Sequence, residues 1–140
     1  MMNKELWGVF HDGVITRVEG DVPGDLALQI EIDYLRKMLP GEGDGFCVQL
    51  SGCTLIEFEN WDGKIEQTPE RLAAQDIELL YIKTLDPLAL DCNEGILRLV
   101  YQAAQVTLDS GEIVSDEALW DASSRYWTAF KERAEAFRKS

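Results

Sequence analysis

Few residues in this sequence could support nucleophilic catalysis. His11 is the single histidine, and it adjoins Asp12-Gly13, a dipeptide typical of tight turns. A serine or cysteine nucleophile needs a base to accept its proton, and no nucleophile motif accompanies this histidine. We therefore predict that His11 is not catalytic. Catalysis by two carboxylates stays open, because a chain with 26 Asp and Glu residues brings some pair to a suitable distance by chance.

Three cysteines, Cys47, Cys53 and Cys92, together with His11 have the composition of a Cys₃His zinc site. Structural zinc sites take their ligands in pairs separated by about two to four residues, a spacing that these cysteines do not show. Three thiols in a chain of 140 residues instead suit a reducing compartment. The run from Asp91 to Gly95 lacks the full pattern of a calcium loop, and no glycine-rich phosphate-binding motif occurs. We expect neither a metal nor a cofactor.

Tryptophans and acids are the residues most typical of a binding surface here. Trp61 lies in a predicted turn among carboxylates, and an aromatic ring surrounded by acids suits a basic partner. Trp120 and Trp127 are seven positions apart, on one side of a predicted C-terminal helix. They either widen the buried stripe of that helix or belong to an interface. The candidate partner-binding residues are Glu57, Glu59, Trp61, Asp62, Glu66, Trp120 and Trp127.

The charge of the chain narrows the choice of partner. Its 13 Lys and Arg against 26 Asp and Glu give a net charge of -13, which repels the phosphates of nucleic acids and anionic lipids. This charge either serves solubility alone or steers the chain toward a basic protein. The first residues show no apolar run of signal-peptide length, and no segment has the ~20 apolar residues of a membrane span. We expect a cytoplasmic protein that binds neither nucleic acid nor membranes.

Antiparallel strands are predicted for most of the chain, which we expect to form a single domain over residues 1–140. In Asp25–Asp33, Leu and Ile alternate with polar residues, as in a strand with one buried face. Leu6–His11 and Val14–Glu19 predict a hairpin around Asp12-Gly13. Phe46–Leu50 and Thr54–Glu59 predict a second hairpin around Ser51-Gly52.

A long C-terminal helix is predicted to follow these strands. Ser115 precedes two acids, a typical helix start, and apolar residues then recur at helical spacing as far as Phe137. Further strands are predicted at Ile77–Thr84, Leu88–Cys92, Ile96–Tyr101 and Ala104–Leu108. Strands before one helix indicate an α+β fold: an antiparallel sheet of about seven or eight strands, built from hairpins, with the helix lying across it.

Four stretches of the sequence resemble small acidic bacterial domains, some of which are similar to immunity proteins that neutralise a cognate toxin by binding it. These stretches are His11–Ile15, Ile30–Arg36, Gly52–Phe58 and Tyr126-Trp127. The resemblance covers most of the chain but contains no diagnostic motif, and it transfers no functional residues. It implies a binding role.

Three functional hypotheses follow. The first is a non-enzymatic binding protein, an immunity-type inhibitor that covers a basic protein surface; it is favoured by the charge and by the missing catalytic set. The alternative is a small-molecule or sugar binder, or a hydrolase, that uses carboxylates in a sheet-lined cleft. The third is a homodimeric scaffold.

Overall fold

The computed structural model describes residues 4–139, which fold into antiparallel strands and helices. The strands are β1 (Val14–Gly20), β2 (Gly24–Glu31), β3 (Gly45–Cys53), β4 (Leu55–Asn60), β5 (Ile65–Glu66), β6 (Leu79–Leu85), β7 (Leu88–Cys92), β8 (Gly95–Val100), β9 (Ala103–Leu108) and β10 (Ile113–Val114). The helices are the 3₁₀ helix η1 (Lys4–Phe10), α1 (Asp33–Arg36), α2 (Pro69–Ala73) and α3 (Asp116–Lys139). The expected α+β class is therefore confirmed.

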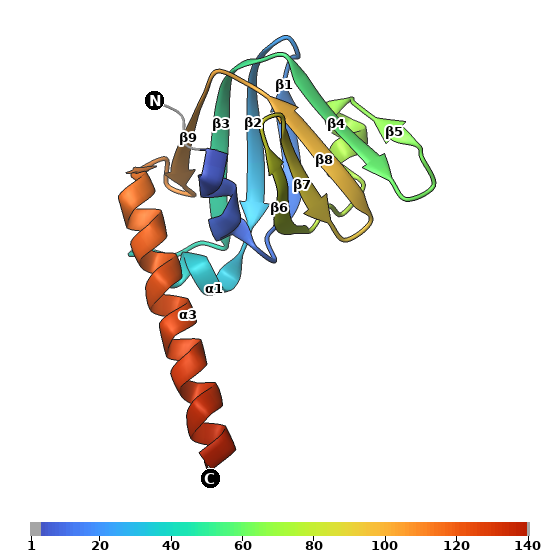
Figure 1. Ribbon diagram of the computed structural model, residues 1–140. Coiled ribbons are helices and arrows are strands. Elements are labelled where there is room, and N and C mark those ends of the chain that lie inside the picture. The colour runs from blue at the N-terminus through green and yellow to red at the C-terminus, as the bar shows by residue number, and fades with distance from the viewer. Residues whose placement is uncertain (1–3, 140) are drawn as a thin grey trace.

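The strands form two sheets of five strands each instead of the single sheet that we expected. The first sheet has the order β1-β2-β3-β9-β10 and the second the order β5-β4-β8-β7-β6, with all pairs antiparallel. Figure 1 shows the two sheets with β9, β3, β2 and β1 on one side and β4, β8, β7 and β6 on the other. The hydrophobic core includes buried residues of both sheets.

The strand predicted at Asp25–Asp33 is confirmed as β2, which lies between β1 and β3. Its Leu26, Leu28 and Ile30 are at most 2% exposed, as the alternating pattern indicates. Each such side chain contributes about 1.5–3 kcal/mol on burial. This alternation therefore fixes which face of the first sheet lines the core.

The second predicted hairpin, around Ser51-Gly52, is wrong. β3 and β4 lie in different sheets, joined by Thr54, whose amide donates to the carbonyl of Val100 at 2.8 Å. Gly52 has a φ of 60°, and a Cβ there would approach the side chain of Gln102. The glycine therefore bends the chain from one sheet to the other instead of reversing it.

The first predicted hairpin is also wrong, because Leu6–His11 is not a strand. Its apolar residues lie at i, i+1, i+3 and i+4, the pattern of one helical face, and they are all buried in η1. The buried residues are Leu6, Trp7, Val9 and Phe10. Val14–Glu19 does form a strand, β1, but it pairs with β2.

A buried hydrogen bond joins η1 to the sheets. Trp7 Nε1 donates to the hydroxyl of Tyr101 at 2.7 Å, at the crossing between β8 and β9. Beyond η1, the amide of Asp12 donates to the carbonyl of Leu79 at 2.7 Å, and the amide of Leu79 donates to the carbonyl of Gly13 at 2.8 Å. These bonds bring the start of β1 beside the start of β6.

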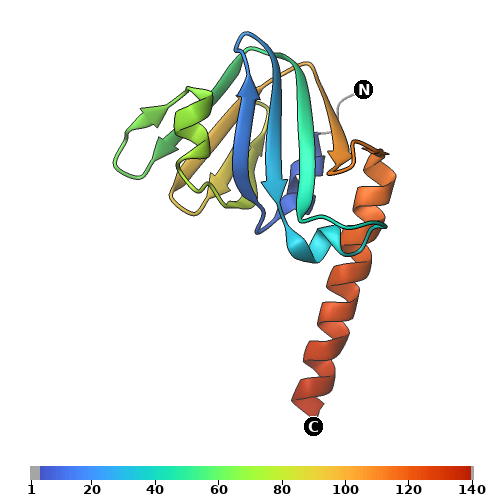
Figure 2. The same ribbon diagram turned by 180° about the vertical axis from the view of Figure 1, so that it is seen from behind.

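Helix α3 begins as predicted, with the amide of Ala118 donating to Ser115 Oγ at 3.1 Å. Leu119 and Ala122 are fully buried, and α3 contacts η1 and α1. Its second half extends away from both sheets (Figures 1 and 2). The expected placement across a sheet is therefore wrong: the sheets pack against each other, and α3 is held at one end of the body. Within residues 4–139, no helix is both long enough and apolar enough to cross a membrane.

Candidate functional site

The structure separates the predicted partner-binding residues into two groups. Glu57, Glu59, Trp61, Asp62 and Glu66 belong to β4, β5 and the turn between them, whereas Trp120 and Trp127 belong to α3. β4 and β5 lie on the opposite side of the body from α3 (Figure 1). A single partner-binding patch made of both groups is therefore not formed.

The acids of the β4–β5 hairpin are mostly paired with basic side chains. Arg98 Nη1 lies 2.9 Å from Glu59 Oε1 and 4.0 Å from Glu57 Oε1. Glu66 is 5% exposed, and Lys64 and Arg71 approach its Oε1 at 3.3 and 3.8 Å. These contacts reduce the negative potential that the sequence alone assigns to the hairpin.

Trp61 remains available at the hairpin, since it is 62% exposed. Its Nε1 donates to the carbonyl of Asn93 at 3.4 Å, which holds the ring against the β7–β8 turn. Next to it, Asp62 is exposed and has no salt bridge within the part of the chain that the structure describes. The hairpin therefore offers one aromatic ring beside a single unpaired acid.

A different group of acids surrounds an open hollow of about 590 Å³ between the start of β1, the end of β2 and the start of α1. We call it the acidic hollow, and its lining residues are Asp12, Val14, Thr16, Glu31, Ile32, Asp33, Tyr34 and Asp76. Four of these eight side chains are carboxylates. All four carboxylate residues are exposed to solvent.

Among the described residues, no lysine or arginine forms an ion pair with a carboxylate of the acidic hollow. Across residues 4–139, the ion pairs that involve its carboxylates reduce to one contact, from His11 Nε2 to Asp12 Oδ1 at 3.5 Å. Uncompensated like charges around one concavity add their potentials and attract cations. The hollow is thus better suited to a basic ligand than the hairpin is.

Local backbone geometry brings the acids of the hollow together. Asp12 and Asp76 have φ values of 72° and 51°, in the left-handed region that Asp enters more readily than most residues. Asn93 Nδ2 donates to the carbonyl of Asp76 at 3.1 Å and so fixes the second turn. Glu31 ends β2, and Asp33 begins α1 two residues later.

Tyr34 connects the acidic hollow to an aromatic cluster at the base of α3. Its ring lies 4.3 Å from that of Tyr126 and 5.6 Å from that of Trp127, and its hydroxyl donates to the carbonyl of His11 at 2.6 Å. Burial raises the pKa of Tyr34, with smaller contributions from Asp12 and Tyr126. Tyr34 therefore stays neutral, and its packed ring separates the acidic hollow from the aromatic cluster.

His11 belongs to the same aromatic cluster. Its position beside an Asp-Gly turn in the sequence did not indicate this contact. Its Nδ1 donates to the carbonyl of Leu80, and its ring lies 5.1 Å from that of Tyr81 and 6.1 Å from that of Trp127. These contacts engage His11 in packing. None of the described serine, threonine or cysteine side chains has a hydrogen bond to its ring.

The three cysteines are free thiols on β3 and β7. Burial raises the pKa of Cys92 to about 12, and burial also raises the pKa of Cys53 and of the half-buried Cys47. Within residues 4–139, no three His, Cys, Asp or Glu side chains are grouped so that they could hold a metal ion.

The exposure of the carboxylates in the hollow limits their chemistry. A carboxyl group that acts as a general acid must keep its proton near neutral pH, which takes burial or a very close second carboxylate. Asp12 has a half-exposed side chain, and Glu31, Asp33 and Asp76 are exposed as well. The arrangement favours electrostatic binding over proton transfer.

Comparisons with known proteins add no family assignment. No protein-family model matches the chain, and no curated protein or solved structure is significantly similar to it.

Proposed function

We propose that this protein is a non-enzymatic binding protein whose acidic hollow receives lysine or arginine side chains of a basic protein partner. The observation that carries the proposal is the set of four exposed carboxylates around one concavity, Asp12, Glu31, Asp33 and Asp76, with no lysine or arginine paired to them in residues 4–139. The net charge of -13 acts in the same direction at longer range.

The energetic effect of such a hollow is expected mainly in the association rate. Each solvent-exposed ion pair with the partner contributes about 0.2–1 kcal/mol, so the four carboxylates together support moderate affinity. A complementary field raises association rates by about 10- to 1,000-fold at low salt. Added salt weakens both effects because it screens exposed charges beyond about 10 Å at 0.1 M.

More specifically, we propose an immunity-type role, in which the protein inhibits its basic partner by binding it. An inhibitor that covers a basic surface needs a rigid acidic face and no catalytic groups of its own. The first condition is supported by the origin of the hollow's residues, which come from β1, β2, α1 and the turns before β1 and β6, all packed onto the core. A cytoplasmic location is part of the same proposal.

A ligand of another class is also proposed, because the hollow has the size of a small-molecule site. Such sites measure about 300–1,000 Å³, which includes its 590 Å³. A sugar or another neutral ligand would bind through hydrogen bonds, so its affinity would change little with ionic strength. Salt dependence therefore separates the two ligand classes.

The test compares an oligo-arginine peptide with a neutral oligosaccharide by calorimetric titration of the full chain. We expect the peptide alone to bind, and the double variant Glu31→Gln with Asp33→Asn to weaken its binding about 3- to 10-fold. The matched control is Asp62→Asn with Glu94→Gln, which removes the same charge from two exposed acids at the β4–β5 hairpin and the β7–β8 turn. Equal weakening by the two double variants would contradict a specific role of the hollow.

A further inference from the structure

The apolar stripe of α3 continues beyond the part of the helix that the body covers. Its residues recur every three or four positions: Leu119, Ala122, Tyr126, Phe130, Ala134 and Phe137. Leu119 and Ala122 are fully buried, whereas Phe130 is 48% and Phe137 is 82% exposed. The same helical face is therefore core in its first half and surface in its second half.

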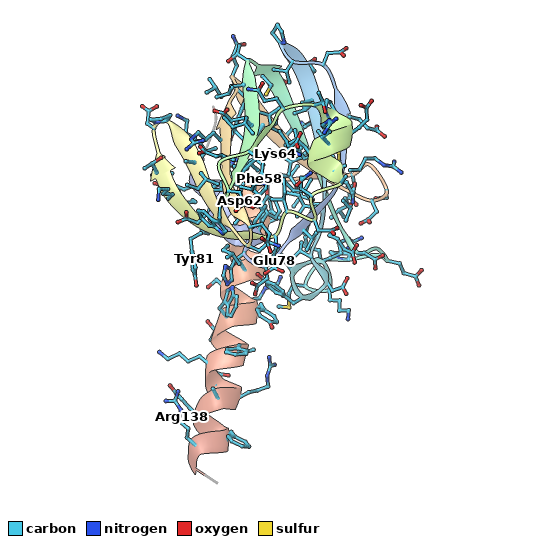
Figure 3. All side chains as sticks on the ribbon, turned by 90° about the vertical axis from the view of Figure 1, so that its right-hand side faces the viewer. Phe58, Asp62, Lys64, Glu78, Tyr81 and Arg138 are labelled. Atoms are coloured by element: carbon cyan, nitrogen blue, oxygen red, sulfur yellow. The ribbon has the colours of Figure 1, made fainter. Side chains whose placement is uncertain are left out.

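Further aromatic surface adjoins this stripe. Trp120 and Trp127 are 41% and 37% exposed along one edge of it, and Tyr81 on β6 is 66% exposed. Tyr81 lies at the end of the body where α3 emerges (Figure 3). Beside Trp127 is a hollow of about 310 Å³, lined by Gly8, His11, Leu80, Tyr81, Ile82 and Trp127. We call this hollow, together with the exposed Trp120, Trp127, Phe130 and Phe137 of α3, the aromatic face.

The charge of the chain is distributed unevenly along the same axis. Residues 122–139 hold five Lys and Arg and two Glu, a net charge of +3, while the remaining residues hold eight Lys and Arg and 24 Asp and Glu, a net charge of -16. The first turns of α3 carry Asp116, Glu117 and Asp121. The helix is thus acidic in its first turns, which lie against the body, and basic where its aromatic side chains are exposed.

We infer that a second copy of this chain covers the aromatic face, with the two α3 helices packed antiparallel. In that arrangement the basic turns of one helix lie beside the acidic turns and acidic body of the other. A parallel pair would place the two basic segments together and the two acidic bodies together, which is unfavourable. The symmetry is that of a two-fold dimer, in which each copy offers the same surface.

The area available agrees with a dimer interface. Aromatic side chains bury about 150–250 Å² each, so the exposed parts of Trp120, Trp127, Phe130, Phe137 and Tyr81 provide about 400–700 Å² per copy. Standard interfaces bury about 800 Å² per partner, and aliphatic and charged side chains around these rings supply the rest. The hollow beside Trp127, with a volume of about 310 Å³, has room for a phenyl ring of the second copy.

The placement of acids on α3 favours a second copy over a lipid surface. Helices that lie on membranes carry Lys and Arg across their polar face. Here Glu132 and Glu135 lie on the side of α3 opposite the stripe, and the remainder of the chain repels anionic headgroups. A second copy is therefore favoured as the partner of the aromatic face, and membrane binding is tested as the alternative.

Sedimentation equilibrium of the full chain tests the inference. We expect a monomer–dimer equilibrium that Phe130→Glu weakens about 100-fold or more, because a charge would be buried among aromatic side chains. Thr128→Glu adds a charge on the polar side of the same helix and should leave the dimer unchanged to within about 3-fold. Circular dichroism checks that both variants keep the helix. A monomer at every concentration up to the millimolar range would overturn the inference, as would equal effects of the two variants.

The orientation of the helices is tested by Arg133→Glu. In an antiparallel pair this change replaces attraction to the partner's acids with repulsion and should weaken the dimer about 3-fold or more. A tighter dimer would overturn the antiparallel arrangement.

A vesicle experiment tests whether a membrane covers the aromatic face instead of a second copy. If the monomer sediments with phosphatidylserine vesicles and Phe130→Glu abolishes this binding, the inference of a second copy is overturned. Glu31→Gln with Asp33→Asn should leave the dimer intact, so this inference and the proposed function fail independently.

Discussion

The side chain of Arg36 is 2% exposed, and its Nε donates to Asp109 Oδ1 at 2.8 Å. The same guanidinium donates to the carbonyls of Pro40 and Glu42, both at 3.0 Å. Arg36 therefore joins α1 to the loop before β3 and to the end of β9. Because α1 carries Asp33 and Tyr34, the contacts of the buried Arg36 side chain also hold one side of the acidic hollow in place.

Replacing Asp109 should destabilise the fold, because the buried guanidinium of Arg36 would lose its counter-charge. For Asp109→Asn we expect the free energy of unfolding to fall by about 2 kcal/mol, less than for a fully buried pair because Asp109 is itself about a third exposed. Urea unfolding at neutral pH measures this loss. The exposed Glu112→Gln is the control and should change stability by less than about 0.5 kcal/mol. A loss no larger than that of the control would show that the pair is not stabilising.

The contribution of Asp109 should depend on pH in a defined direction. Burial alone raises the pKa of Asp109, but the hydrogen bond from Arg36, with bonds from backbone amides, outweighs it and holds the pKa below its ordinary value. A carboxyl group with a lowered pKa stabilises the fold above its ordinary pKa of about 3.9 and loses this effect as the pH falls through the lowered value. The stability difference between wild type and Asp109→Asn should therefore shrink below about pH 4. A difference that stays constant into stronger acid would contradict this assignment.

Gly43 should be intolerant of a side chain, because it faces the same carboxylate. Its φ is 153°, and a Cβ there would lie 2.2 Å from Asp109 Oδ1. Gly43→Ala should displace Asp109 from Arg36 and cost about as much as Asp109→Asn, in addition to about 1 kcal/mol of backbone strain. Gly111→Ala is the matched control, since Gly111 has a φ of 91° but no atom within 4 Å of the added Cβ. Equal losses in thermal unfolding would mean that the contact with Asp109 does not matter.

The three thiols should react slowly in the native protein. Cys53 and Cys92 are buried with raised pKa values, and Cys47 is half-buried, so little thiolate is accessible at neutral pH. A chromogenic disulfide reagent at pH 7 should titrate all three cysteines quickly in denaturant and none of them quickly without it. Rapid reaction of Cys92 in the native protein would conflict with its burial.

Local patterns in the sequence predicted elements whose structure depends on near neighbours. The alternation in β2 and the cap at Ser115 are of this kind, and both are confirmed. The sequence could not distinguish two sheets from one. The residue patterns of β3 and β4 are the same whether the chain reverses at Gly52 to form a hairpin or bends there to enter a second sheet. The helical spacing of Leu6, Trp7, Val9 and Phe10 was present in the sequence but was hidden by the β-prone residue types.

The candidate site was harder to predict for a related reason. Asp12 and Asp76 are 64 positions apart, and they meet at one hollow only because backbone hydrogen bonds from Asp12 and Gly13 to Leu79 hold the start of β1 beside β6. At the β4–β5 hairpin, the sequence showed a run of acids but not that Arg98, Lys64 and Arg71 would pair with them. The exposure of Trp120 and Trp127 depended on how much of α3 the body covers.

The most direct test of the proposed function is to map where a basic ligand contacts the protein. Amide chemical shifts of the isotope-labelled full chain would be followed by NMR during titration with an oligo-arginine peptide at low ionic strength. We expect the largest changes at Asp12, Thr16, Asp33 and Asp76, with loss of these changes in the Glu31→Gln, Asp33→Asn variant. Changes centred on Trp61 and Asp62, or spread evenly over exposed acids, would contradict a binding site at the acidic hollow.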